Sequence, residues 1–240
     1  MKKILKKIAR KLPFAITKNI YYDQLTDDVI KKCCKETTNC IDVGCHKGEI
    51  LDLMIASAPQ GKHYGFEPIP ELYCFLKKKY KGTHCTISET ALSDKNGIIN
   101  FNYVISNPSY SGIKKRHYDR NNEKDTLIEV HTERLDSVLN ENYQVGFMKI
   151  DVEGAELLVL RGAEKTIERC KPVIIFEFGL GASDIYGAEP KDLYHFFEKH
   201  HYKISLLDKW LKDESALSLK ELEEEYYNKN NHYFIAWAAA

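Results

Sequence analysis

Two carboxylates stand beside glycines at a spacing that could hold a nucleotide-like ligand. Asp42 precedes the turn Gly44-Cys-His-Lys-Gly48, and Glu67 ends a second short apolar run further along the chain. Glycine can take a positive φ and lets a ligand approach the backbone closely. An acid about 20 residues after such a turn is where a strand–helix–strand unit returns a side chain to a bound ribose. The spacing therefore predicts that Glu67 binds ribose hydroxyls.

Missing glycines narrow the class of ligand. A dinucleotide fingerprint that began at Gly44 would need glycine where this chain has His46 and Glu49, and the chain has no Gly-Lys-Ser/Thr phosphate loop. An adenosyl ligand with a cationic sulfonium and no phosphate suits the acids and the Gly-x-x-x-Gly turn. We expect the turn to approach the amino-acid tail of such a ligand and Asp42 to position it.

Three further acids could carry the chemistry. Asp151 ends a buried strand, Glu153 follows it, and Glu177 lies in the otherwise apolar run 173–178. Ligands of open parallel sheets bind at the carboxyl ends of the strands, so these acids should face the same crevice as Asp42. Asp151 is our first candidate for a general base, with Glu153 and Glu177 next. The alternative for Glu177 is a structural carboxylate that bonds a neighbouring loop.

Other interpretations of this acidic group stay open. Lys149 shares a strand face with Asp151, which favours an ion pair with a neighbouring acid. The three carboxylates could instead hold a divalent metal ion through oxygen ligands, although we predict no metal site. Glu156, in the first turn of the next helix, is expected to be structural. A single histidine is more often structural than catalytic, but three could serve as bases: His46, His117 and His131.

Alternating strands and helices would position these residues. Short apolar runs predict strands at 40–44, 63–67, 84–87, 98–105, 128–131, 145–151 and 173–178, and helical periodicity covers 49–57, 69–80, 154–169 and 190–200. This order predicts an α/β fold with a mostly parallel sheet and helices on both faces. Two last strands are expected at 202–207 and 232–237, with a helix or long loop over 208–231.

Two turn-rich segments should shape the pocket for a second substrate, the acceptor. Residues 106–126 form either a mobile loop near the ligand or a surface excursion, and the composition favours neither. The loop 180–190 is expected to contribute to the same pocket. Loop identity does not identify the ligand.

Taken together, the motifs resemble the FkbM-type S-adenosylmethionine-dependent methyltransferases over about residues 39–205. The matching blocks are 41–44 with Gly48, 66–70, 91–94 with Gly97, 135–136, 149–156, 160–163 and Glu177. That family usually carries Ala-Asn in its first glycine turn, where this chain has Cys45-His46. The resemblance implies a Rossmann-like, seven-stranded sheet with an antiparallel edge formed by strands six and seven. It also implies O-methylation, often of sugar or polyketide hydroxyls.

The cofactor implied is S-adenosyl-L-methionine, with S-adenosyl-L-homocysteine as product. Its expected contacts lie on the turns that follow three strands: Asp42, Gly44, His46, Gly48, Glu67, Pro68, Ala91, Leu92 and Ser93. The expected acceptor is a small molecule, a sugar or sugar nucleotide. One alternative is an NAD(P)-dependent oxidoreductase, against which the missing glycines argue. Another is a non-catalytic protein that binds an adenosyl ligand on the same scaffold.

Composition limits the partners and the cellular compartment that the protein is expected to have. The 35 basic and 35 acidic residues give zero formal charge, which argues against nucleic acid as a partner. No segment of the sequence has 18 uninterrupted apolar residues, so no transmembrane helix is predicted. The seven cysteines form no Cys-x-x-Cys pair and indicate reduced, mostly buried thiols in a cytoplasmic protein. A homo-oligomer is compatible with all of these features.

Residues 1–38 are expected to form a basic, helical extension before a methyltransferase domain at 39–240. The first 35 residues carry ten Lys and Arg against three Asp. The apolar side chains of 4–12 share one helical face, with lysines on the other. A helix that lies on its own domain is favoured over peripheral contact with a membrane.

Overall fold

The structure is a computed structural model, and it describes residues 18–118 and 122–239. The amphipathic helix expected at 4–12 lies outside the described residues. Among those described, no helix has the length and apolarity needed to cross a lipid bilayer. All seven cysteines are described and are free thiols; three are buried and Cys74 is exposed.

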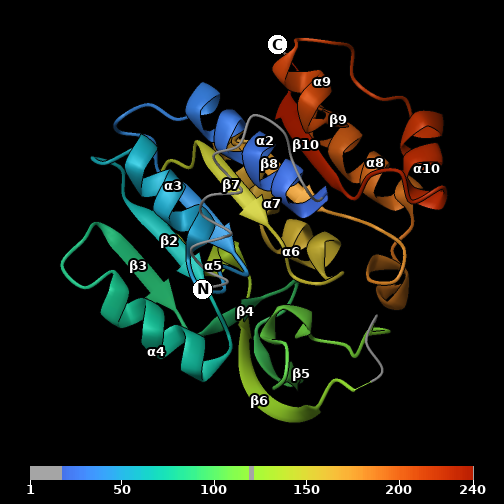
Figure 1. Ribbon diagram of the computed structural model, residues 1–240. Helices are drawn as coiled ribbons and strands as arrows, with labels where there is room; N and C mark the ends of the chain where they lie inside the picture. Colours follow the sequence, from blue (N-terminus) through green and yellow to red (C-terminus); the bar gives the residue numbers. More distant parts are fainter. Residues whose placement is uncertain (1–17, 119–121, 240) are drawn as a thin grey trace.

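A seven-stranded sheet forms the centre of the molecule (Figure 1), in the order β3-β2-β1-β7-β8-β10-β9. Its strands are β1 (Cys40–Val43), β2 (His63–Phe66), β3 (Cys85–Ser88), β7 (Phe147–Ile150), β8 (Val173–Glu177), β9 (Tyr202–Leu206) and β10 (Tyr233–Ala238). β10 pairs antiparallel with both β8 and β9, and the other pairs are parallel. The predicted mostly parallel sheet with its antiparallel edge is confirmed.

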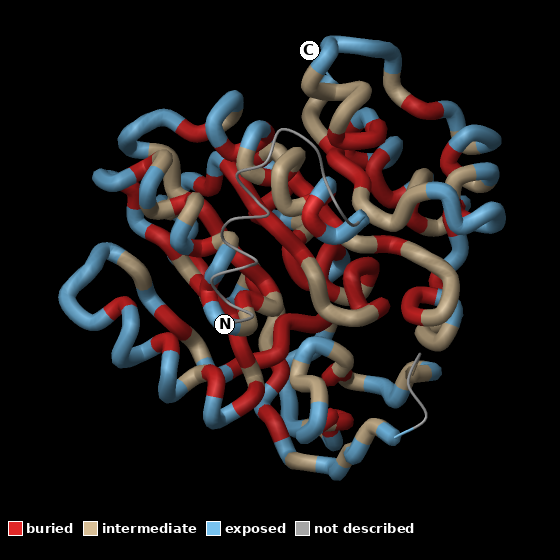
Figure 2. The backbone as a smooth tube through the Cα atoms, viewed as in Figure 1, coloured by how far each residue is buried: buried red, intermediate tan, exposed pale blue. Residues whose placement is uncertain are grey.

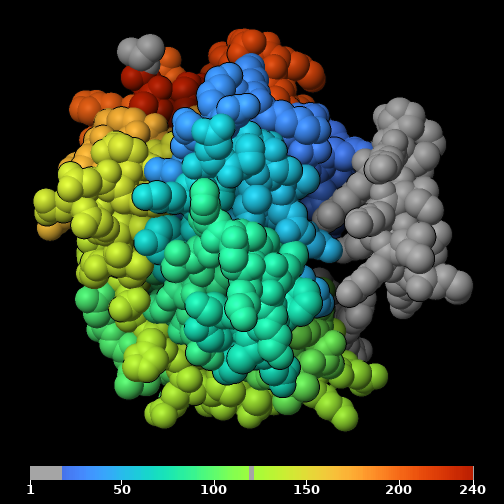
Figure 3. Space-filling model, turned by 90° about the vertical axis from the view of Figure 1, so that its left-hand side faces the viewer, coloured from blue at the N-terminus to red at the C-terminus, as the bar shows by residue number. Residues whose placement is uncertain are grey.

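Helices cover both faces of this sheet (Figure 1). One face packs against α2 (Lys18–Cys33), α3 (Glu49–Ser57), α4 (Pro70–Lys79) and α9 (Leu207–Leu211). The other packs against α5 (Leu135–Val138), α6 (Glu156–Gly162), α7 (Glu164–Cys170), α8 (Pro190–Lys199) and α10 (Leu219–Tyr227). In the space-filling view, α3 and α4 form one continuous surface on the β2–β3 side of the molecule (Figure 3).

Three strands form a separate, smaller sheet that the sequence analysis missed. β4 (Thr90–Leu92), β6 (Asp125–Glu133) and β5 (Gly97–Val104) pair in that order. The strands expected at 98–105 and 128–131 are therefore present, but they are not part of the central sheet. β4 has three residues, which is too short for a strand pattern to be recognised. The sequence therefore did not show where the chain leaves the central sheet.

The helical segments also differ in detail from the expectation. The helix expected over 154–169 is two helices, α6 and α7, which meet at Ala163. Gly162, at this junction, packs so closely on the β4 turn that a Cβ would lie 2.0 Å from the Ser93 carbonyl oxygen. Residues 208–231 contain α10 and most of α9, so this segment is mainly helical. α2 falls within the segment expected as an extension, and its Val29 and Ile30 are fully buried in the core beside α3.

The alternation of side chains along the central strands places the polar site. Cys40, Phe147 and Ile175 pack in the core under α2 and α3, and the central strands are buried (Figure 2). Successive side chains of a strand point to opposite faces, so the residues two positions on face the same helices. These residues lie towards the carboxyl ends of their strands: Asp42, Lys149 and Glu177. The apolar core therefore gives way to charged side chains at one end of one sheet face.

Candidate active site

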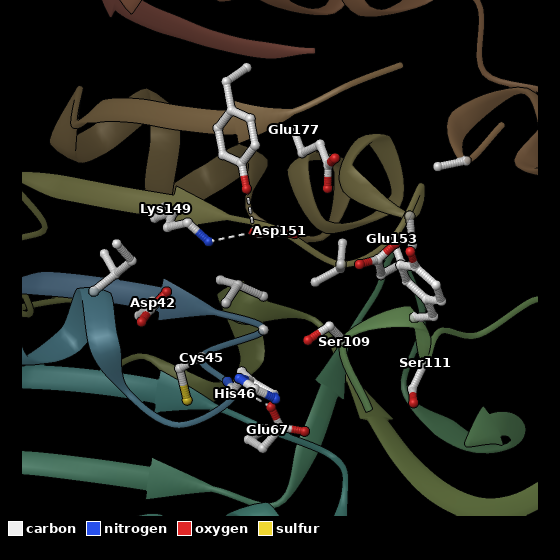
Figure 4. A pocket seen from close by; sticks show the side chains of 18 of the residues that line it. Asp42, Cys45, His46, Glu67, Ser109, Ser111, Lys149, Asp151, Glu153 and Glu177 are labelled. Carbon is white, nitrogen blue, oxygen red and sulfur yellow. Dashed lines mark hydrogen bonds and ion pairs between the residues drawn. The ribbon is translucent and has the colours of Figure 1, made fainter. Parts of the chain in front are cut away.

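A cavity of about 690 Å³ opens beside the carboxyl ends of β1, β2, β7 and β8 (Figure 4). Pockets of this size hold small molecules and cofactors. Most predicted site residues line it: Asp42, Gly44, His46, Glu67, Pro68, Ala91, Leu92, Asp151, Glu153 and Glu177. Gly48 and Ser93 do not line it. His117 and His131 are exposed and also lie away from it.

The first glycine turn passes directly against the turn after β7. Gly44 has φ 77°, and a Cβ built on it would lie 1.9 Å from the carbonyl oxygen of Asp151. Gly48, at the start of α3, has φ 71° and accepts a hydrogen bond of 2.8 Å from the Tyr80 hydroxyl. Gly44 therefore sets the separation between two loops of the cavity. Gly48 is instead held by Tyr80, the C-cap residue of α4.

Replacing Gly44 by alanine should destabilise the protein by more than about 4 kcal/mol, because a methyl group would collide with fixed backbone. The matched control is Gly82→Ala. Gly82 has φ 80° but no atom within 4 Å of a built Cβ, so only the left-handed backbone conformation costs energy, about 1 to 2 kcal/mol. Denaturant unfolding followed by circular dichroism measures both. Equal losses in the two variants would contradict the packing argument.

Glu67 is a buried carboxylate held at the end of β2. Its Oε2 accepts the backbone N–H of His46 at 2.8 Å, and its Oε1 accepts that of Ile69 at 3.0 Å. Only 4% of the residue is exposed, and burial raises the pKa of Glu67 to about 7 despite these two donors. His46 itself has φ 46°, so its unusual backbone conformation is what directs its amide to Glu67. Figure 4 shows the two side by side.

The Cys45-His46 dipeptide thus has a structural account in this chain. Cys45 is buried, and its sulfur would lie 3.1 Å from a Cβ built on Gly65 of β2. The Cys45 side chain therefore fills space against the neighbouring strand, while His46 lines the cavity and contributes a backbone donor to Glu67.

Asp42 is a buried acid that lacks a hydrogen-bond partner. The residue is 1% exposed, and neither carboxylate oxygen has a partner among the described residues. Burial raises the pKa of Asp42 to about 6, although the charge of Lys149 and the nearby Leu51 amide offset part of the effect. Buried polar groups are nearly always satisfied. An unsatisfied carboxylate in a cavity wall suits a ligand that brings a positive charge or a donor.

Asp151 is anchored by two donors that meet at the same oxygen. Lys149 Nζ lies 2.8 Å from Asp151 Oδ2, and the Tyr233 hydroxyl donates to that oxygen at 2.6 Å (Figure 4). The ion pair expected for Lys149 is therefore present. Burial alone would raise the pKa of Asp151, but Lys149 and Tyr233 lower it to about 2. Asp151 is a fixed anion in the folded protein.

Glu177 lies beside Asp151 and behaves in the opposite way. It is the register partner of Tyr233 in the antiparallel pair β8–β10. Burial and then the charge of Asp151 raise the pKa of Glu177 well above its ordinary value. Two adjacent carboxyl groups with pKa values pushed apart hold one proton between them. The opposite pKa shifts favour an ionised Asp151 beside a protonated Glu177.

Glu153 completes the acidic group but has a partner of its own. Its backbone is left-handed, at φ 57°, and its carboxylate forms an ion pair with Arg116. Ligand atoms of Asp151, Glu153 and Glu177 lie within 4.8 Å of one another. Positive charge and donors from the chain already reach two of these carboxylates, and the third retains a proton. We derive no step through a metal.

Comparison with known proteins identifies the family. A family model for the methyltransferase FkbM domain matches residues 42–204, from Asp42 to beyond Glu177. The chain belongs to this family. The methyltransferase sdnD of Sordaria araneosa is 28% identical and aligns over 52% of this chain, which spans 60% of that protein. Since the match covers only part of that relative, its activity is not assigned to this chain.

Solved structures share the FkbM-family fold. An FkbM methyltransferase from Methylobacillus flagellatus KT superposes with a TM-score of 0.54 at 15% identity, covering 85% of this chain and 44% of that one. A putative rRNA-methylase from Clostridium thermocellum gives a TM-score of 0.52 at 10% identity, covering 94% of this chain and 99% of that one. At these identities the likeness extends to the fold alone.

Several cavity residues of this FkbM-family chain were not foreseen from the sequence. Some come from α2, from the segment before β10 and from the start of β10: Tyr22, Asp23, His232 and Tyr233. Others come from the loop 106–126, which includes the short helix η1 (Pro108–Tyr110): Ser109, Tyr110, Ser111 and Arg116. Only the turn-rich composition of that loop gave a signal. The remaining residues belong to no motif and reach the cavity through the folding of the sheet.

The two loops of the FkbM-family cavity are joined to each other. The loop 180–190 contains the short helix η2 (Ser183–Tyr186) and contributes Leu180 and Ala182 to the wall. The Tyr186 hydroxyl accepts the backbone N–H of Lys114 at 2.8 Å, and the Lys114 ammonium donates to the Ile185 carbonyl at 3.1 Å. Both loops line the cavity, as the sequence analysis expected of 180–190 and held as one of two alternatives for 106–126.

The ligand-free protein should lose stability as the pH rises from about 6.5 to about 8. Burial raises the pKa of Glu67 and of Glu156 to about 7, above their ordinary value of 4.5. In this window the folded chain binds more protons than the unfolded chain, so deprotonation favours unfolding. His63 and His232, whose pKa values are lowered in the folded chain, oppose this loss only at the lower end of the window, because an unfolded histidine titrates near pH 6.5. Thermal denaturation at several pH values tests this.

Glu156→Gln provides the comparison for that experiment. Glu156 accepts the backbone N–H groups of Val152 and Gly154 through Oε1, and an amide oxygen can accept the same two bonds. The variant should show a weaker fall in melting temperature across the window. A wild-type melting temperature that rises between these pH values would show that the buried acids are ionised without cost.

Proposed function

We propose that this protein is an S-adenosylmethionine-dependent O-methyltransferase that methylates a hydroxyl of a small molecule, a sugar or glycoconjugate precursor. One observation carries the proposal. A single cavity has the buried acids Asp42 and Glu67 beside the glycine turn in one half, and the Asp151–Glu177 pair in the other. Membership of the FkbM methyltransferase family supports methyl transfer as the reaction.

The first half of the cavity suits an adenosyl ligand. Glu67 can accept hydrogen bonds from ribose hydroxyls, and Asp42 can compensate the positive charge of an amino-acid tail. Apolar side chains lie beside these acids, as a purine ring requires: Ile69, Ala91, Leu92 and Phe101. S-adenosylmethionine supplies a methyl group already activated on a sulfonium, so its transfer mainly requires alignment.

The second half of the cavity provides a proton acceptor. A hydroxyl is a poor nucleophile at neutral pH, and its proton needs a base within hydrogen-bond reach. We assign that base to the deprotonated form of Glu177, because its raised pKa makes it a stronger base than the first candidate from the sequence, Asp151. Asp151, with a pKa of about 2, is too weak a base for a hydroxyl proton. Its fixed negative charge instead raises the pKa of Glu177.

The polar lining around this pair supports a polyhydroxyl acceptor. Hydroxyl and amide side chains reach the cavity from three segments: Ser109, Tyr110, Ser111, Tyr226 and Asn231. Such groups fix the orientation of a ligand that carries several hydroxyls.

The test is release of S-adenosylhomocysteine from S-adenosylmethionine in the presence of a panel of sugars and sugar nucleotides. Acceptor-dependent release and a mass increase of one methyl group in the acceptor are expected. A thermal-shift comparison of S-adenosylhomocysteine with NADH runs beside it. Stabilisation by NADH and none by S-adenosylhomocysteine would overturn the proposal in favour of an oxidoreductase.

A further inference from the structure

Tyr233 makes a direct contact with the carboxyl pair, yet no motif marks it. It begins β10, the strand that runs antiparallel between β8 and β9. Its hydroxyl donates to Asp151 Oδ2 at 2.6 Å, and its register partner across β8 is Glu177. The phenol therefore binds one carboxyl of the pair, while its strand position sets it next to the other.

The position of Tyr233 is fixed by packing. Its ring centroid lies 4.9 Å from that of Tyr22 on α2, so the two rings pack together. The phenol hydroxyl of Tyr233 is thereby held at Asp151 from outside the β7 turn, while Lys149 reaches the same oxygen from within β7.

We propose that Tyr233 is a positioning residue for the Asp151–Glu177 pair: its phenol fixes Asp151 as the anion, so that Glu177 is the carboxyl that carries the exchangeable proton. Both donors lie on Oδ2 of Asp151, and no hydrogen bond from a described residue to Oδ1 competes with Glu177. A carboxylate that accepts two such donors is stabilised in its charged form. The inference deepens the proposed function. Only the use of that proton in catalysis rests on the proposed function.

Other charged groups around the pair do not substitute for the phenol. Arg116 is paired with Glu153. Asp42 is an acid whose charge acts on Lys149, and it has no hydrogen to donate to Asp151. The remaining groups that face the pair are acids or a histidine: Asp23 on α2, Glu156 on α6 and His232 before β10. Apart from the proton that Asp151 shares with Glu177, Lys149 and Tyr233 supply the hydrogen bonds that Asp151 accepts from other side chains of the described residues.

Carboxyl NMR on the full chain tests the inference without turnover. The protein is labelled with carbon-13 at the side-chain carboxyls of Asp and Glu, and Asp151→Asn and Glu177→Gln assign the two resonances. At pH 7 in wild type we expect Asp151 to give a carboxylate shift and Glu177 a shift towards the protonated form. In Tyr233→Phe the two should move towards each other, because the proton is shared more evenly.

Tyr22→Phe is the matched control, since it removes a hydroxyl one ring further from Asp151. It should leave both resonances in place. A reciprocal measurement needs no change at Tyr233: Asp151→Asn should shift the phenol carbon resonance of Tyr233 and not that of Tyr22. Unchanged Asp151 and Glu177 shifts in Tyr233→Phe, or an unchanged Tyr233 phenol in Asp151→Asn, would overturn the inference.

An activity measurement then separates this inference from the proposed function. Once an acceptor releases S-adenosylhomocysteine, the midpoint of the acidic limb of kcat against pH should move down in Tyr233→Phe, by about one unit, because Glu177 gives up its proton more readily. A uniform loss with no change of midpoint would contradict the positioning role, whereas failure of every acceptor concerns only the proposed function.

Discussion

Glu67→Gln should weaken binding of S-adenosylhomocysteine by about 10- to 100-fold, because a neutral amide replaces the charged acceptor proposed for the ribose hydroxyls. The fold should be kept. An amide oxygen can accept only part of what Glu67 now binds, the backbone N–H groups of His46 and Ile69. Isothermal titration calorimetry measures the affinity, and Glu71→Gln, on the first turn of α4 and outside the cavity wall, is the control.

The same variant gives a pH signature. The pKa of Glu67 is about 7 in the ligand-free protein, so its carboxyl is protonated below that pH and loses acceptor capacity. Wild-type affinity for S-adenosylhomocysteine should therefore fall as the pH drops from about 8 to about 6. Glu67→Gln should show little change over this range. Equal affinities of variant and wild type at pH 8 would remove Glu67 from the cofactor site.

Glu177→Gln should lower kcat by about 100- to 10,000-fold while binding S-adenosylhomocysteine as wild type does. Glutamine matches the shape of the protonated glutamic acid but cannot accept a proton. Because it removes a buried ionisable group, the variant should also melt no lower than wild type. Glu129→Gln, on an exposed position of β6, is the control for a neutral carboxyl substitution. A near wild-type rate in Glu177→Gln would place the base elsewhere.

Asp151→Asn separates the two carboxyls. It should also turn over slowly, since the pKa of Glu177 would fall towards its ordinary value without the neighbouring charge. Unlike Glu177→Gln, it leaves the buried ammonium of Lys149 without its ion-pair partner and should cost about 3 kcal/mol of stability. A melting temperature that drops in Asp151→Asn and not in Glu177→Gln distinguishes an anchoring anion from a base.

The parts of the site predicted from the sequence are those that the local backbone dictates. The glycine turn, Glu67 and the block around Asp151 each follow a strand within a few residues, and the carboxyl ends of parallel strands meet at one edge. That rule placed acids from three separate segments at one cavity before any contact was known. It also placed Gly48 and Ser93 there, and both instead pack against neighbouring elements behind the wall.

The sequence did not predict the roles of those acids, because these roles depend on contacts between segments far apart in the chain. Asp151 was ranked first as base from its position. The phenol of Tyr233, 82 residues away, and the ammonium of Lys149 hold it ionised. Burial, and then the anion beside it, raise the pKa of Glu177. No periodicity or motif in the sequence encodes such a difference between two carboxyls.

The sequence by itself determined the family, the sheet and the set of acids, since strand patterns and turn residues are local properties. Tertiary structure alone decided what closes the cavity and how its charges are shared. α2, which precedes every recognised motif, supplies Tyr22 and Asp23 to the wall, and β10 brings Tyr233 to Asp151 from near the other end of the chain. Burial then sets the protonation of each acid, because the cost of a charge depends on the groups packed around it.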